Sequence, residues 1–396
     1  MVTSRVPRRH PSEGTMVPTP QPKGAASASP DRAIRVLLTT PDASMPGGVA
    51  QYLRVLRPHL PGDVLYFTIG SRSERERTGA AMLRVLQDSW RFARTLSQGN
   101  FDIVHLNPSI VPKALLRDGA LLVLAKALRT RVLVFAHGWG DTCERALSRH
   151  LSPLFRLVYG RADAFIVLGK EFKERLRRLG YNRTVFVQAA PIEDDLLACS
   201  YERRVRRCAD GSHQKFNILF LSRIEKEKGI YEALETYRIL KQQHPYVSLT
   251  VTGDGSHLSR AVNHVQTLNL ADVSFSGHVE GTAKYEIFQS ADAYLFPSYS
   301  EGLPLSVLEA MASGLPIVTS AVGGLRDFFE NGTMGFMTQS REPEVLASLL
   351  SRLICDPDLY AKISLFNHKY ARDQFTSSQV AAQLERVYRF LHESAD

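Results

Sequence analysis

Short runs of apolar residues alternate along the chain with longer segments in which apolar residues recur every three or four positions. A short continuous apolar run is typical of a strand buried on both faces, and the longer periodicity is typical of a helix that buries one side. Strands that alternate with helices predict a parallel, doubly wound α/β sheet. Before residue 195 the expected strands are 34–39, 64–67, 101–106, 131–136, 162–168 and 185–187, and the expected helices follow residue 48 and lie near 82–97, 113–128, 144–159 and 170–180.

The same alternation restarts after a segment that has no apolar periodicity. This segment, 196–214, contains Arg203, Arg204, Arg206 and Arg207. An arginine run can bind nucleic acid, but no aromatic residues are interleaved with this one, so we expect a solvated linker. Beyond it the expected strands are 216–221, 249–252, 273–279, 291–297 and 316–319, and the expected helices begin near 230 and 305 and lie near 343–354, 357–370 and 376–392.

These elements divide the chain into five regions. We expect a disordered leader at 1–30, a first domain at 31–195, the linker at 196–214, a second domain at 215–374 and a last helix at 375–396. The leader holds six of the 20 prolines and has no apolar core of the kind a signal peptide needs. Met16 is an alternative start.

Composition places the chain among ordinary soluble proteins but its charge is uneven. Residues 1–200 carry 29 Lys and Arg against 17 Asp and Glu, a net of +12, within a total of +9. This balance predicts an anionic partner for the first domain, such as a membrane surface, unless it serves solubility alone. No stretch approaches the roughly 20 apolar residues of a membrane-spanning helix. The four cysteines form no CxxC pair, which favours a reducing compartment and therefore the cytoplasm.

The most informative motif is a pair of glutamates around a predicted helix start. Glu301 precedes the helix and Glu309 lies inside it, about 12 Å further along if all residues between are helical. The first backbone N–H groups of a helix attract anions, so Gly302, Leu303, Pro304 and Leu305 form a candidate phosphate site. Glu309 lies among apolar residues, and an unpaired buried carboxylate is costly, so a binding role is favoured over a solvated face.

Further candidates lie where expected strands end, which is where ligands bind in such sheets. Gly47 and Gly48 follow the first strand and precede a helix. His137 follows the strand 131–136, and His105 lies near the end of another strand, where we expect a loose role on the acceptor side. Arg223 and Lys228 bracket the loop after the strand 216–221, where two cations suit a diphosphate, although surface salt bridges are the alternative.

The spacing from Glu301 to Glu309, with 312–318 and 322–324, resembles the retaining glycosyltransferases of family 4, also called glycosyl transferases group 1. The resemblance runs from about residue 34 to the C-terminus. This sequence differs from the family at Gly169, near which the family often has a serine or threonine. It implies the GT-B fold: two Rossmann-like domains facing a central cleft, with the last helix crossing back to the first domain.

The same resemblance implies roles for these residues. Glu301 would orient the donor sugar, Glu309 would bind the ribose and His137 would contact the transferred sugar. The catalytic set is therefore Glu301, His137, Arg223 and Lys228. The donor-binding set is Gly47, Gly48, Arg223, Lys228, Gly253, His278, Val279, Gly302, Leu303, Pro304, Leu305 and Glu309, with His278 and Val279 beside the nucleobase.

The implied reaction moves a sugar from a UDP- or GDP-sugar to an acceptor hydroxyl, with retained configuration and with neither cofactor nor metal. We expect a saccharide or lipid-linked saccharide acceptor of bacterial cell-surface polysaccharide synthesis and no nucleic-acid partner. The basic helices 82–97 and 170–180 would dock the protein on the inner face of the cytoplasmic membrane. The alternative is that the apolar stripes of both helices pack onto the sheet, and docking remains compatible with this if only the basic side chains reach lipid. The alternatives are a GT-B sugar-nucleotide epimerase and a catalytically silent partner subunit. The sequence does not specify the sugar, the base, the acceptor or the oligomeric state.

Overall fold

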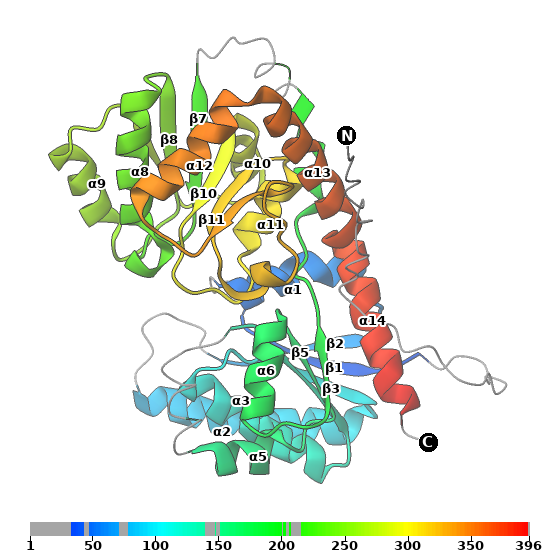
Figure 1. Ribbon diagram of the computed structural model, residues 1–396. Helices are drawn as coiled ribbons and strands as arrows, with labels where there is room; N and C mark the ends of the chain where they lie inside the picture. The colour runs from blue at the N-terminus through cyan, green and yellow to red at the C-terminus, as the bar shows by residue number, and fades with distance from the viewer. Residues whose placement is uncertain are drawn as a thin grey trace, which may run out of the picture.

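The fold is built on two parallel sheets, seen one above the other in the computed structural model (Figure 1). The structure describes residues 33–42, 47–70, 78–138, 147, 151–199, 201–202, 206 and 215–394. We refer to the unit around the first sheet as the first domain and the unit around the second sheet as the second domain. The predicted α/β class with two doubly wound sheets is confirmed.

The first sheet has the strand order β2-β1-β3-β4-β5-β6, and every described pairing is parallel. Neighbouring residues of one strand face opposite sides of the sheet, so Leu133 and Phe135 of β4 enter one core and Val132 and Val134 enter another. The strands are β1 (Val36–Thr40), β2 (Val64–Thr68), β3 (Ile103–Leu106), β4 (Arg131–Ala136), β5 (Ala164–Val167) and β6 (Thr184–Val187), and the helices are α1 (Gly48–Leu56), α2 (Thr78–Gly99), α3 (Pro112–Ala127), α5 (Ser152–Tyr159) and α6 (Lys170–Arg178).

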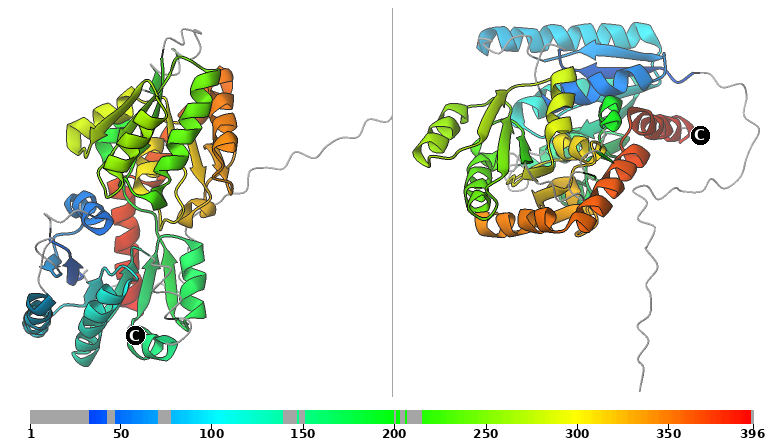
Figure 2. Two further views of the ribbon diagram at one scale, coloured as in Figure 1. Left: turned by 90° about the vertical axis from the view of Figure 1, so that its left-hand side faces the viewer. Right: turned by 90° about the horizontal axis from the view of Figure 1, so that it is seen from above.

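The second sheet has the order β12-β11-β10-β7-β8-β9, again with parallel pairings, and helices lie on both of its sides (Figure 2). Its strands are β7 (Phe216–Leu221), β8 (Val247–Thr252), β9 (Val273–Gly277), β10 (Ala293–Phe296), β11 (Ile317–Ser320) and β12 (Gly335–Thr338). Its helices are α8 (Ile230–Gln243), α9 (Leu258–Thr267), α10 (Gly281–Ser290), α11 (Leu305–Ala312), α12 (Pro343–Cys355) and α13 (Pro357–Gln374). The sequence did not predict β12, α9 or α10.

The final helix, α14 (Ser377–Glu393), leaves the second domain and lies along the first (Figure 1). Its Tyr388 hydroxyl lies 2.8 Å from Nδ1 of His105, and the Gln188 amide donates to the carbonyl of Val380 at 3.1 Å. His105 is completely buried, and burial lowers its pKa to about 3. The predicted acceptor-side role of His105 is therefore wrong, because the side chain belongs to the seam between β3 and α14.

The basic helices of the first domain differ in what they expose. On α6, Phe172 and Leu176 are 5% and 0% exposed, and Leu179 directly after it is 1% exposed, because all three pack into the core of the first domain. The apolar stripe of this helix therefore packs onto the sheet, as the alternative held, and only its basic side chains remain to meet a membrane. On α2, by contrast, Leu86 and Trp90 are 64% and 63% exposed.

Gly229 fixes how the loop after β7 meets the loop after β10. Its φ of 80° lies in the left-handed region, and a Cβ added here would lie 2.3 Å from the carbonyl oxygen of Pro297. Only glycine tolerates both conditions. The residue before it, Lys228, is thereby held against the segment that begins at Ser298.

Candidate active site

Loops at the carboxyl ends of the strands in both domains come into direct contact. The backbone of Gly302, after β10, approaches the carbonyl oxygen of His137, after β4, so closely that a Cβ on Gly302 would lie 3.1 Å from it. The backbone N–H of Lys170 donates to Oδ2 of Asp327 at 2.5 Å, and Arg326 pairs with Glu171 at 3.2 Å. We call this region the domain junction. It is the edge at which parallel sheets bind ligands.

Glu301 and Lys228 form an ion pair at this junction. The Lys228 ammonium donates to Oε1 of Glu301 at 2.6 Å, and the Ser298 hydroxyl donates to the same oxygen at 2.8 Å. The Lys228 and Glu301 side chains are 16% and 12% exposed, so the charges meet in a partly shielded place. Arg223, predicted to act with Lys228, is exposed at the end of β7 on the same loop. The spacing in sequence did not reveal that Lys228 contacts Glu301 itself.

Glu309 is buried in α11, as its apolar neighbours predicted, and it is not unpaired. It is 6% exposed, and its Oε1 accepts a hydrogen bond from the ammonium of Lys284 on α10 at 2.7 Å. Sequence reasoning missed Lys284. The available signal was its position four residues before Phe288, on the side of α10 that a helical period directs into the core.

His137 lies at the junction in a neutral state. Burial lowers its pKa to about 3, and His105 acts in the same direction. Nε2 lies 2.8 Å from Oδ1 of Asn107, whose amide nitrogen donates to the carbonyl of Thr39 at 2.9 Å. Asn107 therefore presents an acceptor to His137, so Nε2 carries the proton and Nδ1 is the acceptor in the neutral ring. A neutral imidazole can exchange hydrogen bonds with a sugar without adding charge.

The remaining predicted donor-site residues lie around the same edges. Gly47 and Gly48 are exposed where α1 begins. Leu305 is the first residue of α11 and Pro304 precedes it, while Leu303 is 6% exposed beside Gly302.

The segment predicted to lie beside the nucleobase is at the outer end of the second sheet. The N–H of Gly253 donates to the carbonyl of Gly277 at 2.7 Å, which ties the ends of β8 and β9 together. His278 is exposed and lies 3.3 Å from Glu280, and Val279 is half-buried between them. Among the described residues no group of three or more His, Cys, Asp or Glu side chains is arranged to hold a metal ion.

Two family descriptions match adjoining parts of the chain. Residues 207–369 match "Glycosyl transferases group 1", and residues 21–190 match "Glycosyl transferase 4-like domain". Residues 191–206 separate the two matches, which together span most of the chain.

Relatives and a solved structure resemble the chain over most of its length. A glycogen synthase of Mycobacterium tuberculosis is 24% identical over 330 residues, which is 82% of this chain and 76% of the relative. The putative colanic acid biosynthesis glycosyltransferase WcaL of Salmonella typhimurium is 24% identical, over 72% of this chain and 70% of the relative. The structure of Anabaena HepE in complex with UDP-glucose has a TM-score of 0.68 at 18% identity, covering 90% of this chain and 99% of that one.

Proposed function

This chain belongs to the glycosyl transferases group 1 family and has the GT-B fold, and we propose that it moves a sugar from a nucleoside diphosphate sugar to an acceptor hydroxyl with retained configuration. The observation that carries the proposal is the Lys228–Glu301 pair at the domain junction, with His137 of the other domain beside Gly302. The donor is a UDP- or GDP-sugar. Similarity to a structure that holds UDP-glucose supports the uridine nucleotide.

In this mechanism the protein stabilises the departing diphosphate rather than attacking the sugar. The bond from the sugar C1 to the phosphate oxygen breaks while the acceptor oxygen bonds to C1 on the same face. The acceptor proton passes to the departing phosphate oxygen, so the products are a glycoside and a nucleoside diphosphate. Arg223, Lys228 and the N-terminal N–H groups of α11 neutralise the growing negative charge, which is where fixed charges accelerate a reaction most.

The carboxylates and His137 orient the donor in this scheme. Glu301, held by Lys228 and Ser298, accepts hydroxyl hydrogen bonds from the donor sugar, and Glu309 accepts them from the ribose. Lys228 bridges Glu301 and the diphosphate when the donor is bound. His137 contacts the sugar from the first domain, so both domains are needed to hold one substrate.

A single assay separates this proposal from its two alternatives. The purified protein is incubated with UDP- and GDP-sugars, with and without saccharide acceptors, and nucleotide release, donor configuration and product configuration are followed by NMR. We expect nucleotide release that requires acceptor and a product with the anomeric configuration of the donor. Donor epimerised without acceptor would indicate an epimerase, and no change of any donor would indicate a silent subunit.

Activity should survive removal of divalent metal ions. The cations that face the diphosphate in the proposal are the side chains of Arg223 and Lys228, so no metal ion has to neutralise it. Turnover measured with and without EDTA tests this expectation. Complete loss of turnover in EDTA, followed by recovery on addition of Mg²⁺ or Mn²⁺, would contradict it.

The proposed acceptor is a lipid-linked saccharide at the inner face of the cytoplasmic membrane. Similarity to proteins named for colanic acid, amylovoran and capsular polysaccharide biosynthesis supports a polysaccharide intermediate. In the part of the chain that the structure describes, no helix is long and apolar enough to cross a membrane. The proposal is therefore one of peripheral docking.

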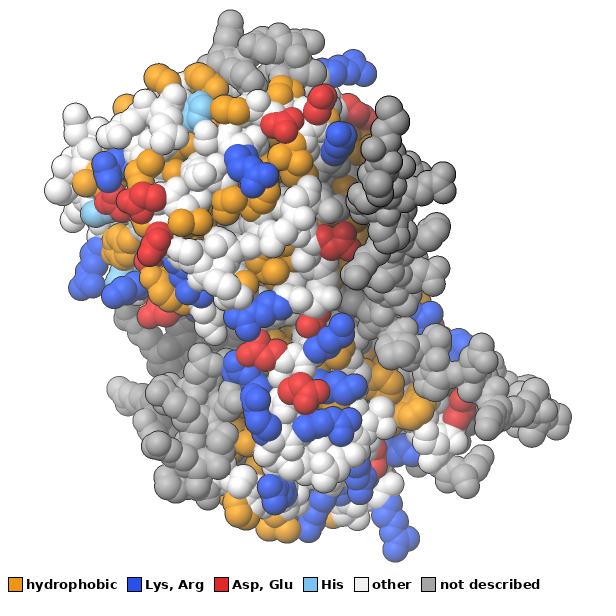
Figure 3. Space-filling view, in the orientation of Figure 1, with side chains coloured by type: hydrophobic (Ala, Val, Ile, Leu, Met, Phe, Trp, Pro, Cys, Tyr) orange, Lys and Arg blue, Asp and Glu red, His pale blue; other side chains and the backbone are white. Residues whose placement is uncertain are grey.

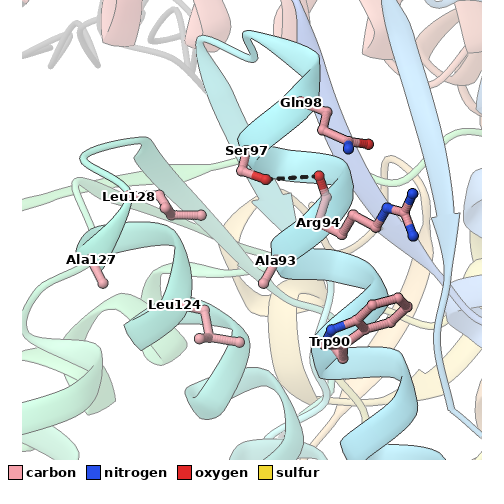
Figure 4. Close-up of a pocket in the computed structure, with 8 residues that line it drawn as sticks. All are labelled: Trp90, Ala93, Arg94, Ser97, Gln98, Leu124, Ala127 and Leu128. Carbon is pink, nitrogen blue, oxygen red and sulfur yellow. Dashed lines mark hydrogen bonds between the residues drawn. The ribbon is translucent and has the colours of Figure 1, made fainter.

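The outer side of α2, α3 and α5 has the chemistry for such docking, and we call it the docking face. In the described part of these helices its exposed large apolar residues are Leu83, Leu86, Trp90, Leu116, Val123, Leu154 and Leu157. A groove between α2 and α3 is lined by Trp90, Ala93, Arg94, Ser97 and Gln98 of α2, by Leu124 and Ala127 of α3, and by Leu128 directly after α3 (Figure 4). In Figure 3, Lys and Arg side chains of the first domain gather around the place of α6, in the lower half of the view.

The docking face exposes no acidic side chain from these three helices. Their acidic residues are Asp88 and Asp118, which are 3% and 0% exposed. Asp118 pairs with Arg117 at 2.6 Å. Arg91, Arg94, Lys113 and Arg156 remain exposed. Each basic residue near an anionic leaflet contributes about 1 kcal/mol, so this set suffices for reversible binding.

The double variant Leu86→Ser/Trp90→Ser should lose liposome binding by roughly tenfold, because it removes two exposed apolar side chains from the docking face. Sedimentation with vesicles that contain phosphatidylglycerol, at low and high salt, measures this loss. The control is Leu365→Ser, which removes a leucine that is 54% exposed on α13 of the second domain. Equal failure of the unaltered protein to bind neutral and anionic vesicles at low salt would contradict docking and favour a soluble acceptor.

A further inference from the structure

A lysine that is almost completely buried joins two carboxylates behind the proposed ribose site. The Lys284 ammonium donates to Oε1 of Glu309 at 2.7 Å and to Oε1 of Glu193 at 2.9 Å. The side chains of Lys284 and Glu309 are 9% and 8% exposed, and that of Glu193 is 29% exposed. These distances make both contacts charge-assisted hydrogen bonds, which are the strong kind in a protein interior.

The environment keeps this lysine charged. Burial alone would lower the pKa of Lys284, but the carboxylates of Glu309 and Glu193 outweigh it, and the pKa is raised. A buried ammonium is tolerated only when such partners compensate for lost hydration. Two carboxylates and one ammonium leave this cluster one negative charge in excess.

The cluster extends into the first domain. The amide nitrogen of Gln51 donates to Oε1 of Glu193 at 2.5 Å, and Gln51 lies on α1, which begins at Gly48. Glu193 lies between β6 and the second domain. A continuous hydrogen-bonded chain therefore runs from Gln51 through Glu193 and Lys284 to Glu309. This hydrogen-bonded chain joins α1, which begins at the glycine pair Gly47 and Gly48, to the carboxylate of Glu309 on α11.

We propose that Lys284 is a positioning residue that fixes the carboxylate of Glu309 for recognition of the donor ribose, and that Glu193 couples this recognition to α1. The bond from Lys284 occupies Oε1 of Glu309, and the second carboxylate oxygen accepts from a ribose hydroxyl. Without Lys284 the carboxylate is buried with no cation, so it takes up a proton or turns toward water. Either change removes the directed acceptor. This inference rests on the ribose role of Glu309 in the proposed function.

Deoxynucleotides test the inference directly. The dissociation constants of UDP, GDP and ADP are compared with those of their 2′-deoxy and 3′-deoxy forms by titration calorimetry. The unaltered protein should bind the ribonucleotide of its preferred base roughly tenfold or more tightly than a deoxy form, because a missing hydroxyl leaves a buried acceptor unpaired. Lys284→Met should reduce that ratio to about one, and Lys284→Arg should restore part of it.

A matched lysine provides the control for general damage. Lys241→Met removes another lysine of the second domain, whose ammonium donates to Asp272 at 2.6 Å and to two backbone carbonyls. This variant should lose thermal stability without changing the ratio of ribose to deoxyribose binding. If Lys284 had only a structural role, Lys284→Met would likewise lose thermal stability without a change in the ratio of ribose to deoxyribose binding. An unchanged ratio in Lys284→Met would therefore overturn the inference.

A double variant covers the case in which Lys284→Met does not fold. Glu309→Gln replaces the carboxylate by a neutral amide. Adding Lys284→Met to this variant should therefore cause no further change in the ratio of ribose to deoxyribose binding. A further loss in the double variant would overturn the coupling between the two residues. If the unaltered protein itself fails to distinguish ribose from deoxyribose, the ribose role of Glu309 fails, which is a separate outcome.

Discussion

Replacing Lys228 by alanine should lower kcat/KM for the donor by about a hundredfold or more, and Arg223→Ala should do the same. In the proposed reaction both side chains stabilise charge that develops on the leaving diphosphate, so their loss raises the barrier to departure. The fold should tolerate both changes. Arg223 is exposed, and Glu301 keeps its hydrogen bond from Ser298 at 2.8 Å after Lys228 is removed.

The control for this prediction is Lys226→Ala. Lys226 is an exposed lysine on the same short 3₁₀ helix, η4 (Lys226–Lys228), so its removal changes the local net charge equally. Steady-state kinetics and thermal unfolding are measured for all three variants. Near-normal turnover in both Arg223→Ala and Lys228→Ala would show that these residues do not bind the diphosphate. An equal loss in Lys226→Ala would indicate a general electrostatic effect instead.

The parallel α/β architecture followed from the sequence because buried parallel strands are continuous apolar runs. β4 and β10 are of this kind, and each was predicted close to its observed limits. β12 was missed because Gly335–Thr338 is short, begins with glycine and lies at the edge of its sheet. Edge strands need fewer apolar residues than central ones, so their pattern is weak.

Some residues of the candidate site could be found from local sequence patterns, but the contacts between distant residues could not. Glu301 and Glu309 could be singled out because a helix start between two carboxylates is a local pattern. The contact of Lys228 with Glu301 joins residues 73 positions apart, and that of Lys284 with Glu309 joins residues 25 apart. Periodicity does not encode such pairings. The roles predicted for these residues in binding and catalysis stay predictions until the variants are measured.

The sequence pattern of an amphipathic helix also does not show whether its apolar side chains are buried or exposed in the fold. α2 and α6 both carry basic residues beside an apolar stripe, and the same membrane-docking role was predicted for both. α6 turns its stripe onto the sheet, where Leu176 is completely buried, while α2 leaves Trp90 at the surface. α2 does bury Phe92 and Leu96 in the same core as Leu176, so which side of each helix is covered depends on its tertiary packing.

Gly324 is placed where the two domains touch. It lies in the short helix η5 (Gly323–Asp327) after β11, and its N–H donates to the carbonyl of Gly302 at 2.7 Å. A Cβ added at Gly324 would lie 2.1 Å from the carbonyl oxygen of Leu168, which belongs to the first domain. This is far inside van der Waals contact, and the obstructing atom is backbone. The overlap is relieved most easily by separation of the domains.

Gly324→Val should therefore lower kcat by about a hundredfold while leaving nucleoside diphosphate binding within roughly threefold of normal. Arg223, Lys228 and Glu309 all lie in the second domain and still bind the nucleotide, but His137 moves away from the sugar, and a displacement of about 1 Å is enough for such a loss. Kinetics, calorimetry and the radius of gyration from small-angle scattering measure the three effects. Gly62→Val is the matched control, because a Cβ at Gly62 meets nothing within 4 Å. Full turnover in Gly324→Val with an unchanged radius of gyration would mean that the junction adapts locally, and catalysis would then not depend on this contact.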